Sequence, residues 1–350
     1  MLFRSTLMSI TLLQRSITSL NTMPKQMKRI RSFSKATAMQ SPTFSLANKL
    51  NVTDDITHNH RPAVIGHRGS LYTALENTSR SFIEAAQAGA DGIELDVFLL
   101  KCGTLVVFHG TGTDQSPGLL SSYCGIEGSI LEYTADEARS QLTFNKHSDQ
   151  FGCGPDLITD DNHDDHYCYV HTLEEVLITL RDHPDVKPDF VIKIELKGPG
   201  TAFPSVELVK KHNMIHRCQF ASFNHERIAE VKYLAPDAIT GALWADLPDD
   251  FLERCLQVQA DEVHFRYDTC THNNVEAAHN AGLNTMAWFR GPKAMGTDAI
   301  KYHDVGNEDV NMYKTVLQSG VMSLCANRPS IALEAVLEQV ARCISDDEDE

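Results

Sequence analysis

Short apolar runs alternate with amphipathic segments along most of the chain, beginning near residue 63. The run 63–67 is largely apolar, the segment 77–88 has apolar residues at helical spacing, and the run 92–97 is again mostly apolar. A strand, a helix and a second strand in this order predict a βαβ unit with two parallel strands. Six further runs of strand length follow, at 190–196, 219–223, 240–243, 262–265, 284–289 and 321–325.

Helix-like segments separate nearly all of these eight runs. They lie at 205–212, 226–234, 249–259, 273–280 and 309–318. Eight strands that alternate with helices are typical of a (β/α)8 TIM barrel, an α/β fold whose parallel sheet closes on itself. A doubly wound open sheet is the alternative fold.

One apolar run breaks the alternation, because 105–109 follows 92–97 after only a few residues. A parallel strand needs a crossover of a dozen or more residues, so this run is predicted to return antiparallel as a β-hairpin inserted after strand two. Residue pairs whose numbers sum to about 203 then lie opposite one another, which places His109 opposite Glu94 unless a bulge shifts the register by one residue.

The segment 110–170 has no regular period and is rich in Gly, Asp and His, so we expect a long inserted loop. Within it, the stretch 160–166 contains closely spaced acids and histidines. Such a stretch can bind a metal ion, but acids in an exposed loop are more often only solvated. We therefore favour a solvated loop there.

Acidic side chains interrupt two of the predicted strands. Glu94 and Asp96 are two residues apart, so both point to one face, and the same spacing puts Lys193, Glu195 and Lys197 on one face of the third strand. Neighbouring carboxylates in an apolar strand resist burial without a positive partner. Because active sites form at the carboxyl ends of barrel strands, the three acids indicate a hard divalent cation, Mg2+ or Ca2+. The alternatives are a solvated rim pair for the first two and a surface ion pair between Glu195 and Lys197.

The end of the first strand carries a second group of reactive residues. His67 and Arg68 are flanked by glycines, which allow the backbone to approach a ligand closely. Arg68 suits bidentate contact with phosphate oxygens, and His67 can take or give a proton near neutral pH. Asn77 or Thr78 opens the next helix, and we expect one of them to be its N-cap.

Six short motifs that include these residues follow one another along the chain. They are Gly66-His67-Arg68-Gly69, Glu76-Asn77-Thr78, Ile93-Glu94-Leu95-Asp96-Val97, Val106-Val107-Phe108-His109, Thr172-Leu173-Glu174-Glu175-Val176-Leu177 and Ile194-Glu195-Leu196-Lys197. Each motif alone is weak evidence, but their joint occurrence is specific. The same motifs occur in this order in the glycerophosphodiester phosphodiesterases, and the chain resembles that family over about residues 62–337.

The resemblance implies a (β/α)8 barrel that hydrolyses a small-molecule glycerophosphodiester to glycerol 3-phosphate and an alcohol, with a divalent cation as cofactor. It also implies a role for each matching residue. The implied roles are acid/base catalysis by His67 and His109, metal binding by Glu94, Asp96 and Glu195, phosphate binding by Arg68 and Lys197, and lining of the glycerol side of the pocket by Trp288. For Trp288, a core or rim aromatic is an equal alternative.

The chain departs from the family pattern at three positions. Gly110 follows His109 where the family commonly has Asp, so a carboxylate that orients this histidine is either absent or supplied by Asp114. Leu75 replaces the usual proline ahead of the second motif, and Asn327 stands where the family tends to have Asp. We expect these changes to affect fine specificity more than catalysis.

The charge distribution separates the first 53 residues from the rest. The first acidic residue is Asp54 and eight basic residues precede it, although the whole chain has a net charge of −16. An acid-free, Ser/Thr-rich beginning is typical of a transit peptide, for a mitochondrion rather than a plastid, and a disordered basic tail is the alternative. The strongly acidic remainder should not bind nucleic acid broadly.

The composition is that of an ordinary globular protein, with 42% hydrophobic residues over 350 positions. No apolar run approaches the ~20 residues of a membrane span. Nine cysteines without a Cys-x-x-Cys pair favour a reducing compartment. We predict a basic targeting or disordered segment at 1–55, a barrel domain at 62–340 and an acidic tail at 345–350.

Two other functions remain open. A related barrel can act as a phospholipase D-like enzyme on lysophospholipids or sphingolipids, and a barrel can be a catalytically silent binding module. A metal-dependent amidohydrolase is disfavoured, because that chemistry usually needs a His-x-His pair on the first strand, and residues 67–69 do not supply one.

Overall fold

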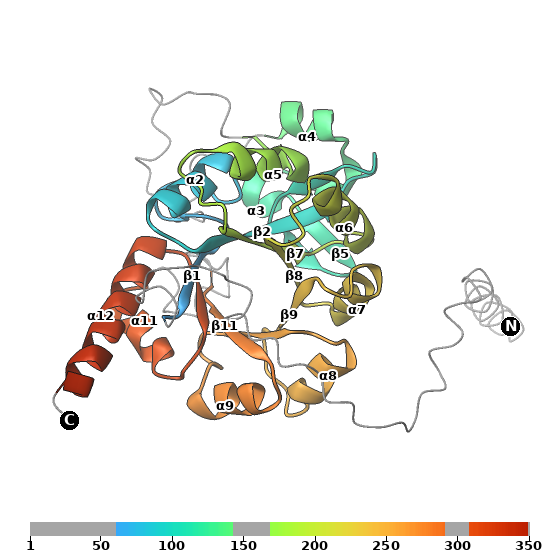
Figure 1. The fold of residues 1–350 in the computed structure, drawn as a ribbon. Coiled ribbons are helices and arrows are strands. Elements are labelled where there is room, and N and C mark those ends of the chain that lie inside the picture. Colours follow the sequence, from blue (N-terminus) through green and yellow to red (C-terminus); the bar gives the residue numbers. More distant parts are fainter. Residues whose placement is uncertain (1–60, 143–168, 291–307, 349–350) are drawn as a thin grey trace, which may run out of the picture. The chain divides into compact units, whose positions relative to one another are not determined.

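Eight parallel strands close into a barrel in the computed structural model, which describes residues 61–142, 169–290 and 308–348 (Figure 1). Strand β1 pairs with both β2 and β12, and these pairings close the ring. The barrel strands are β1 (Ala63–Gly66), β2 (Gly92–Leu99), β7 (Val191–Leu196), β8 (Cys218–Ser222), β9 (Ile239–Leu243), β10 (Glu262–Arg266), β11 (Asn284–Trp288) and β12 (Ser323–Ala326). The predicted (β/α)8 TIM barrel is confirmed, and the open doubly wound sheet was wrong.

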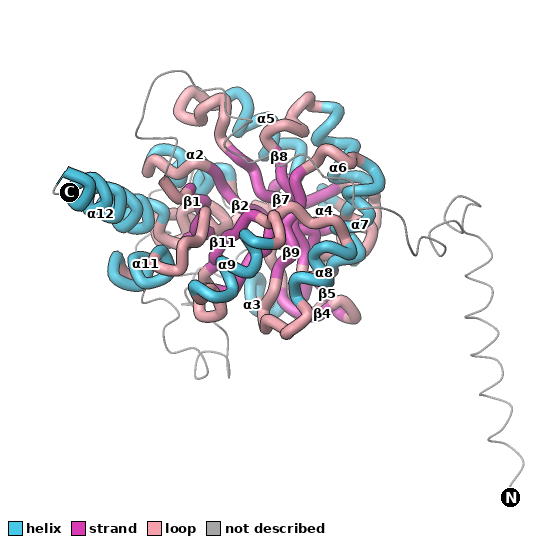
Figure 2. Tube along the Cα trace, turned by 60° about the horizontal axis from the view of Figure 1, so that its bottom comes forward, coloured by secondary structure: helices cyan, strands magenta, loops and turns pink. Residues whose placement is uncertain are grey.

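Helices lie outside the ring of strands (Figure 2). Polar side chains fix where several of them begin: Thr78 accepts a hydrogen bond from the Ser81 N–H, Thr172 forms a capping box with Glu175, and Asn224 caps α7. The helices that cover the barrel are α2 (Ser79–Gln87), α5 (Leu173–Asp182), α6 (Ala202–Lys211), α7 (His225–Leu234), α8 (Phe251–Gln257), α9 (His272–Asn280), α11 (Val310–Leu317) and α12 (Pro329–Glu348).

Side-chain alternation along β2 separates the apolar core from the barrel interior. Ile93, Leu95 and Val97 are fully buried in a cluster that includes apolar residues of α2, α5 and α6. Glu94 and Asp96 alternate with them, so they point to the opposite face, inside the barrel. Strand β7 has the same arrangement, with Lys193 and Glu195 on the inner face. The charged side chains of both strands therefore lie inside the ring.

The run after β2 returns antiparallel as predicted, but its register differs by one residue. Strand β3 (Leu105–Val107) pairs with β2 so that Val97 lies opposite Val107. The predicted pairing of Glu94 with His109 was therefore wrong, because it required pairs shifted by one position.

The turn between β2 and β3 explains the shift. The Leu100 N–H donates to the Thr104 carbonyl at 2.9 Å, which leaves three residues in the loop, and Gly103 has a φ of 84°. A three-residue loop with a left-handed glycine is a favoured hairpin connection. The three-residue loop therefore sets a register that differs by one residue from the predicted pairing.

The excursion that follows β3 is more regular than the sequence predicted. Residues 111–142 form short elements, and β6 then pairs antiparallel with β3 before α5 begins. The elements of the excursion are β4 (Thr111–Thr113), β5 (Ser116–Leu119), α3 (Ser121–Cys124), a 3-10 helix (Ile130–Glu132), α4 (Ala135–Gln141) and β6 (His171–Thr172). The acidic and histidine-rich stretch 160–166 lies outside the described residues.

The sequence predicts a basic targeting or disordered segment at the start of the chain and a solvated acidic tail at its end. The basic segment 1–55 lies outside the described residues, and α12 continues into the predicted acidic tail as far as Glu348. In the part of the chain that the structure describes, none of the helices combines the length and the apolar character needed to cross a membrane.

Candidate active site

Three carboxylates from two neighbouring strands lie together inside the barrel. Glu94 and Asp96 come from β2 and Glu195 from β7, and Asp96 lies directly opposite Glu195 in the parallel ladder. One oxygen of each carboxylate lies within 4.8 Å of the others. Their exposed fractions are 6%, 1% and 9%. The structure thus brings together the three acids that the sequence analysis selected as metal ligands.

The three acids form an excess of buried negative charge. Burial raises the pKa of Glu94 well above its usual range, and the neighbouring Asp96 and Glu195 raise it further. Burial also raises the pKa of Glu195, although Lys197 opposes the shift. Oε1 of Glu94 is buried and has no hydrogen-bond partner among the described residues. Oxygen ligands with unmet negative charge fit a hard divalent cation.

Two cationic side chains flank the acids without saturating them. Nζ of Lys197 is 3.4 Å from Oδ1 of Asp96 and 3.6 Å from Oε1 of Glu195, and Nε of Arg68 is 3.5 Å from Oδ2 of Asp96. Charge-assisted hydrogen bonds are usually about 2.7–2.9 Å long. Because these contacts are longer, both cations keep donor capacity for an anion that enters the site.

A sharp turn after β1 aims Arg68 into the site. Arg68 has a φ of 54° and Gly69 a φ of 96°, and a Cβ at Gly69 would come within 2.3 Å of Oγ of Ser81. The Arg68 N–H donates to Glu94 at 3.1 Å, and its NH1 group donates to both carboxylate oxygens of Glu76 at 3.1 and 3.2 Å. A left-handed backbone is costly for arginine, so these contacts must hold the turn in place.

Asn77 holds Asp96, a role that the sequence analysis missed. Its Nδ2 donates to Oδ2 of Asp96 at 2.9 Å, and its Oδ1 accepts the Asp96 N–H at 3.2 Å. The cap of α2 is Thr78, so Asn77 is free to face the barrel interior. The available signal was its place in the same motif as Glu76.

His67 lies directly after β1, and its two ring nitrogens face different groups. Nδ1 is 2.7 Å from Oδ1 of Asn327, and Nε2 is 3.9 Å from Oε2 of Glu94. The amide nitrogen of Asn327 donates to Glu308 and to the Arg290 carbonyl, so its amide oxygen faces the ring. Because an amide oxygen only accepts hydrogen bonds, Nδ1 carries the proton. Nε2 is left facing the acids.

The surroundings of His67 keep it neutral. Burial lowers its pKa to about 3, and Arg68 contributes to the decrease. Behind Asn327, burial raises the pKa of Glu308 to about 7, and the Tyr313 hydroxyl donates to the same carboxylate. Glu308 was also missed by the sequence analysis, because it precedes a predicted helix and belongs to none of the six motifs.

His109 follows β3 and is held by Tyr123. Its Nδ1 lies 2.6 Å from the tyrosine oxygen. Burial lowers the pKa of His109 well below its usual range, and the positive charges of Arg68 and Lys197, together with His67, lower it further. The same tyrosine oxygen lies 3.5 Å from NH1 of Arg68, which places His109 beside the cation that flanks the acids.

Asp114 does not orient His109, although the sequence analysis left that possibility open. Its carboxylate accepts hydrogen bonds from Nδ2 of Asn224 at 2.8 Å and from NH2 of Arg227 at 3.0 Å. These contacts fasten the β4–β5 hairpin to the start of α7. Tyr123 occupies the position next to His109 instead, and the sequence offered no signal for it, because α3 lies in a segment without a regular period.

Trp288 ends β11, on a different part of the ring from β2 and β7. Its indole N–H donates to the Trp244 carbonyl at 3.2 Å, and its ring meets Phe223 edge to face at 5.7 Å. Trp288 is only partly buried, and it packs on the apolar cluster of Ile65 and Met286. The residue therefore combines features of both readings, a rim aromatic and a side chain that can line a pocket.

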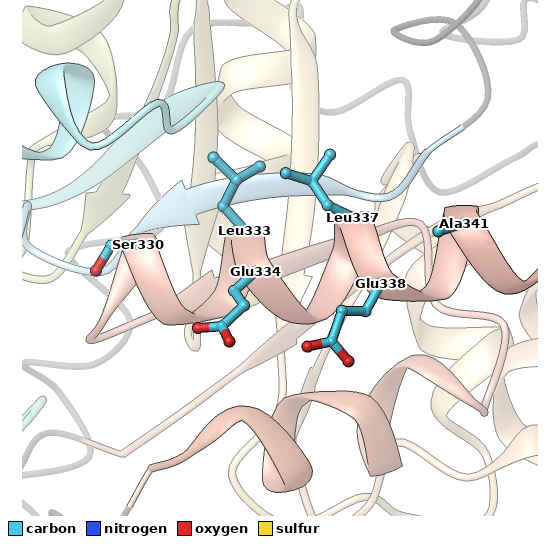
Figure 3. Close-up of a pocket in the computed structure, with 6 residues that line it drawn as sticks. All are labelled: Ser330, Leu333, Glu334, Leu337, Glu338 and Ala341. Atoms are coloured by element: carbon cyan, nitrogen blue, oxygen red, sulfur yellow. The ribbon is translucent and has the colours of Figure 1, made fainter.

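A groove of about 460 Å³ runs along α12 and is separate from these residues (Figure 3). Its walls combine apolar and acidic side chains on one helix, and none of the predicted site residues lines it. The lining residues are Ser330, Leu333, Glu334, Leu337, Glu338 and Ala341. The groove therefore has no part in the candidate active site.

Comparison with known sequences identifies a family. The profile of the "Glycerophosphoryl diester phosphodiesterase family" matches residues 67–329. A glycerophosphodiester phosphodiesterase of Caldanaerobacter subterraneus subsp. tengcongensis is 29% identical over 230 residues, which cover 64% of this chain and 84% of that protein. One from Bacillus altitudinis is 28% identical over 198 residues, which cover 54% of this chain and 71% of that protein.

Comparison with solved structures supports the fold. An Oleispira antarctica phosphodiesterase in complex with the product sn-glycerol-3-phosphate matches with a TM-score of 0.60 and 22% identity, over 79% of this chain and 97% of that one. A glycerophosphodiester phosphodiesterase from Parabacteroides distasonis matches with a TM-score of 0.58 and 20% identity, over 79% and 98% of the two chains. At this level of identity the likeness establishes a common barrel.

Proposed function

The chain belongs to the glycerophosphoryl diester phosphodiesterase family, and on that premise we propose that it hydrolyses a small glycerophosphodiester to sn-glycerol 3-phosphate and an alcohol by metal-assisted acid/base catalysis. The matched segment, residues 67–329, contains every residue of the candidate site. The observation that carries the proposal is the convergence of three buried carboxylates within 4.8 Å, beside two cations and two neutral histidines.

The acids provide the place for a cation. Glu94, Asp96 and Glu195 would hold Mg2+ or Ca2+, and the unpartnered Oε1 of Glu94 supports this fit. When bound, a divalent cation supplies positive charge that stabilises the phosphoryl oxygens as the transition state develops.

Arg68 and Lys197 bind the phosphodiester anion. In a chain whose net charge is −16, such an anion needs local positive charge. Although burial lowers the pKa of Lys197, Glu195 and Asp96 raise it above its usual range, so the ammonium group stays charged. Nε of Arg68 has no hydrogen-bond partner among the described residues and is available to a phosphate oxygen.

His67 and His109 transfer the protons. Each ring has Nδ1 engaged, by Asn327 and by Tyr123 respectively, so Nε2 is the nitrogen available for chemistry. One histidine takes, at Nε2, the proton of the attacking hydroxyl, which belongs to water or to the neighbouring carbon of the glycerol; its oxygen bonds to phosphorus as the bond to the leaving alcohol breaks. The other histidine enters the reaction protonated from solvent and gives its Nε2 proton to the leaving alcohol. Where the glycerol hydroxyl attacks, water then opens the cyclic phosphate with the two histidines in exchanged roles. Positioned groups of this kind contribute typically about 10²–10⁴-fold to the rate.

Trp288 lines the side of the pocket that receives the glycerol. Its indole is fixed by the Trp244 carbonyl and by Phe223, so a flat apolar face is held at the end of β11. Such a face suits the carbon skeleton of glycerol, whereas the charged half of the substrate meets β2 and β7.

The test is hydrolysis of soluble glycerophosphocholine and glycerophosphoethanolamine by the full chain, scored by release of glycerol 3-phosphate. We expect release with Mg2+ or Ca2+, and loss of release after chelation that the added cation restores. Hydrolysis of micellar lysophospholipid but not of the soluble diesters would instead favour a phospholipase D-like enzyme. A folded chain that binds no cation and hydrolyses neither substrate would indicate a silent barrel and overturn the proposal.

A further inference from the structure

Tyr123 reaches the site from outside the barrel. It lies on α3, within the excursion between β3 and β6, and is 7% exposed. Its ring packs edge to face on Phe108 with centroids 5.3 Å apart, which fixes the direction of the hydroxyl. The hydroxyl oxygen is 2.6 Å from Nδ1 of His109. A short, buried contact of this kind holds an imidazole in one orientation.

The hydroxyl has further partners that decide which way its proton points. NH1 of Arg68 donates to it at 3.5 Å and to both oxygens of Glu76 at 3.1 and 3.2 Å, so the Glu76 carboxylate lies beside the hydroxyl and attracts its proton. Burial, together with Glu76, raises the pKa of Tyr123 well above its usual range, so the phenol keeps its single proton. The Tyr123 hydroxyl directs this proton to the Glu76 carboxylate, which can only accept. The lone pairs of the tyrosine oxygen are then left to accept hydrogen bonds from His109 and Arg68.

The proton arrangement at His109 follows from this network. Since the tyrosine oxygen accepts, Nδ1 of His109 must donate and therefore carries the hydrogen. Nε2 then has the free lone pair. His67 is set in the same tautomer by Asn327, so two neutral partners do what a carboxylate does for a catalytic histidine elsewhere.

We propose that Tyr123 is a positioning residue that fixes the orientation and tautomer of His109, in the place where this chain has Gly110 and no carboxylate. This inference rests on the proposed function only for the role of His109. The assignment of the tautomer itself rests on the contacts of Tyr123. A rival explanation is that Tyr123 supports only Arg68 and Glu76, and so affects substrate binding.

The kinetic test uses Tyr123→Phe in the full chain, because this change removes the hydroxyl and keeps the ring on Phe108. With glycerophosphocholine we expect kcat to fall by about 10- to 100-fold and KM to stay within about twofold, as for other partners that orient a histidine. The matched control is Tyr133→Phe, from the same excursion, which should leave both constants unchanged. A higher KM with normal kcat would assign Tyr123 to Arg68 and overturn the proposal.

A spectroscopic test is independent of turnover. Long-range 1H–15N correlation spectra of histidine side chains distinguish the two neutral tautomers, and His109→Gln identifies the His109 signals. We expect the Nδ1–H form in the native chain and a mixture of tautomers in Tyr123→Phe. A native Nε2–H form, or a tautomer unaffected by Tyr123→Phe, would overturn the inference. If the native chain hydrolyses no diester, the proposed function fails, while this spectrum still decides the role of Tyr123.

Discussion

Two groups of polar and charged residues lie inside the barrel, and their charges are balanced in opposite ways. One, here the inner cluster, consists of Lys193, Gln219, Glu262 and His264. The other, here the mouth cluster, consists of Glu94, Asp96, Glu195 and Lys197. Lys193 and Glu195 are two residues apart on β7, so one strand supplies both clusters.

The inner cluster satisfies its charges internally. Nζ of Lys193 is 2.6 Å from Oε2 of Glu262, and Nε2 of His264 is 2.8 Å from the same oxygen. Burial acts to raise the pKa of Glu262, but Lys193 and His264 outweigh it and lower the pKa to about 2. In the mouth cluster, Nζ of Lys197 lies 3.4 Å from Asp96 and 3.6 Å from Glu195, and the pKa of Glu94 is raised. Full burial of charge therefore does not itself mark the site, whereas burial without compensation does.

The largest effect should come from breaking the inner cluster. Lys193→Met leaves Glu262 buried without its main partner, and we expect the free energy of unfolding to fall by about 3–5 kcal/mol. Denaturant unfolding measures this loss. Lys187→Met, at an exposed position before β7, is the control and should change stability by less than about 0.5 kcal/mol. A loss of under about 1 kcal/mol for Lys193→Met would mean that the inner cluster is not balanced as described.

At the mouth, activity should suffer instead of stability. Glu195→Gln and His67→Ala should each lower kcat/KM by at least about 10²-fold, because one removes a proposed metal ligand and the other a proposed proton-transfer group. Glu195→Gln keeps the side-chain volume and relieves repulsion, so its free energy of unfolding should not fall. Steady-state assays on purified variants check the rates, with the exposed Glu207→Gln as control. Near-normal turnover of either variant would remove that residue from the mechanism.

The inner cluster should also give a pH dependence with a definite sign. The pKa of Glu262 falls from 4.5 to about 2 on folding, so its contribution to stability is complete above pH 4.5 and is lost as the pH falls toward 2. Relative to Glu262→Gln, the native chain should therefore lose about 2 kcal/mol of unfolding free energy between pH 5 and pH 3. Denaturant unfolding across this range measures the difference. A gap between the two chains that stays constant with pH would contradict the assignment.

The smallest effect should come from filling the mouth cluster. A cation that binds only the folded chain stabilises it by about 1.4 kcal/mol at ten times its Kd. Thermal unfolding with Mg2+ or Ca2+, before and after chelation, should show this gain for the native chain and a smaller one for Glu195→Gln. Equal gains in both proteins would place the cation elsewhere.

Secondary structure and the faces of individual strands could be predicted from the sequence, because both depend on the spacing of nearby residues. Contacts between residues far apart in the chain could not. The eight strands followed from apolar runs between helices, and the faces of Glu94, Asp96 and Glu195 followed from alternation along a strand. The partners of the histidines depend on three-dimensional closure. Tyr123 comes from a segment without periodicity, and Glu308 acts from behind an asparagine.

The hairpin register failed for a related reason. The apolar run fixed the direction of β3, but the length of the turn fixed the pairing, and one left-handed glycine decided that length. Gly103 is not part of the hydrophobic pattern, so that pattern could not predict the length of the turn.

The hydrogen bond between His67 and Asn327 joins residues 260 positions apart, the first and last strands of the barrel. A nascent chain that has not yet been synthesised past β12 lacks both the strand that closes the ring beside β1 and the amide that holds the His67 ring. We therefore expect the orientation of His67 to be fixed last during synthesis, and to be lost again when a protease removes the final strand.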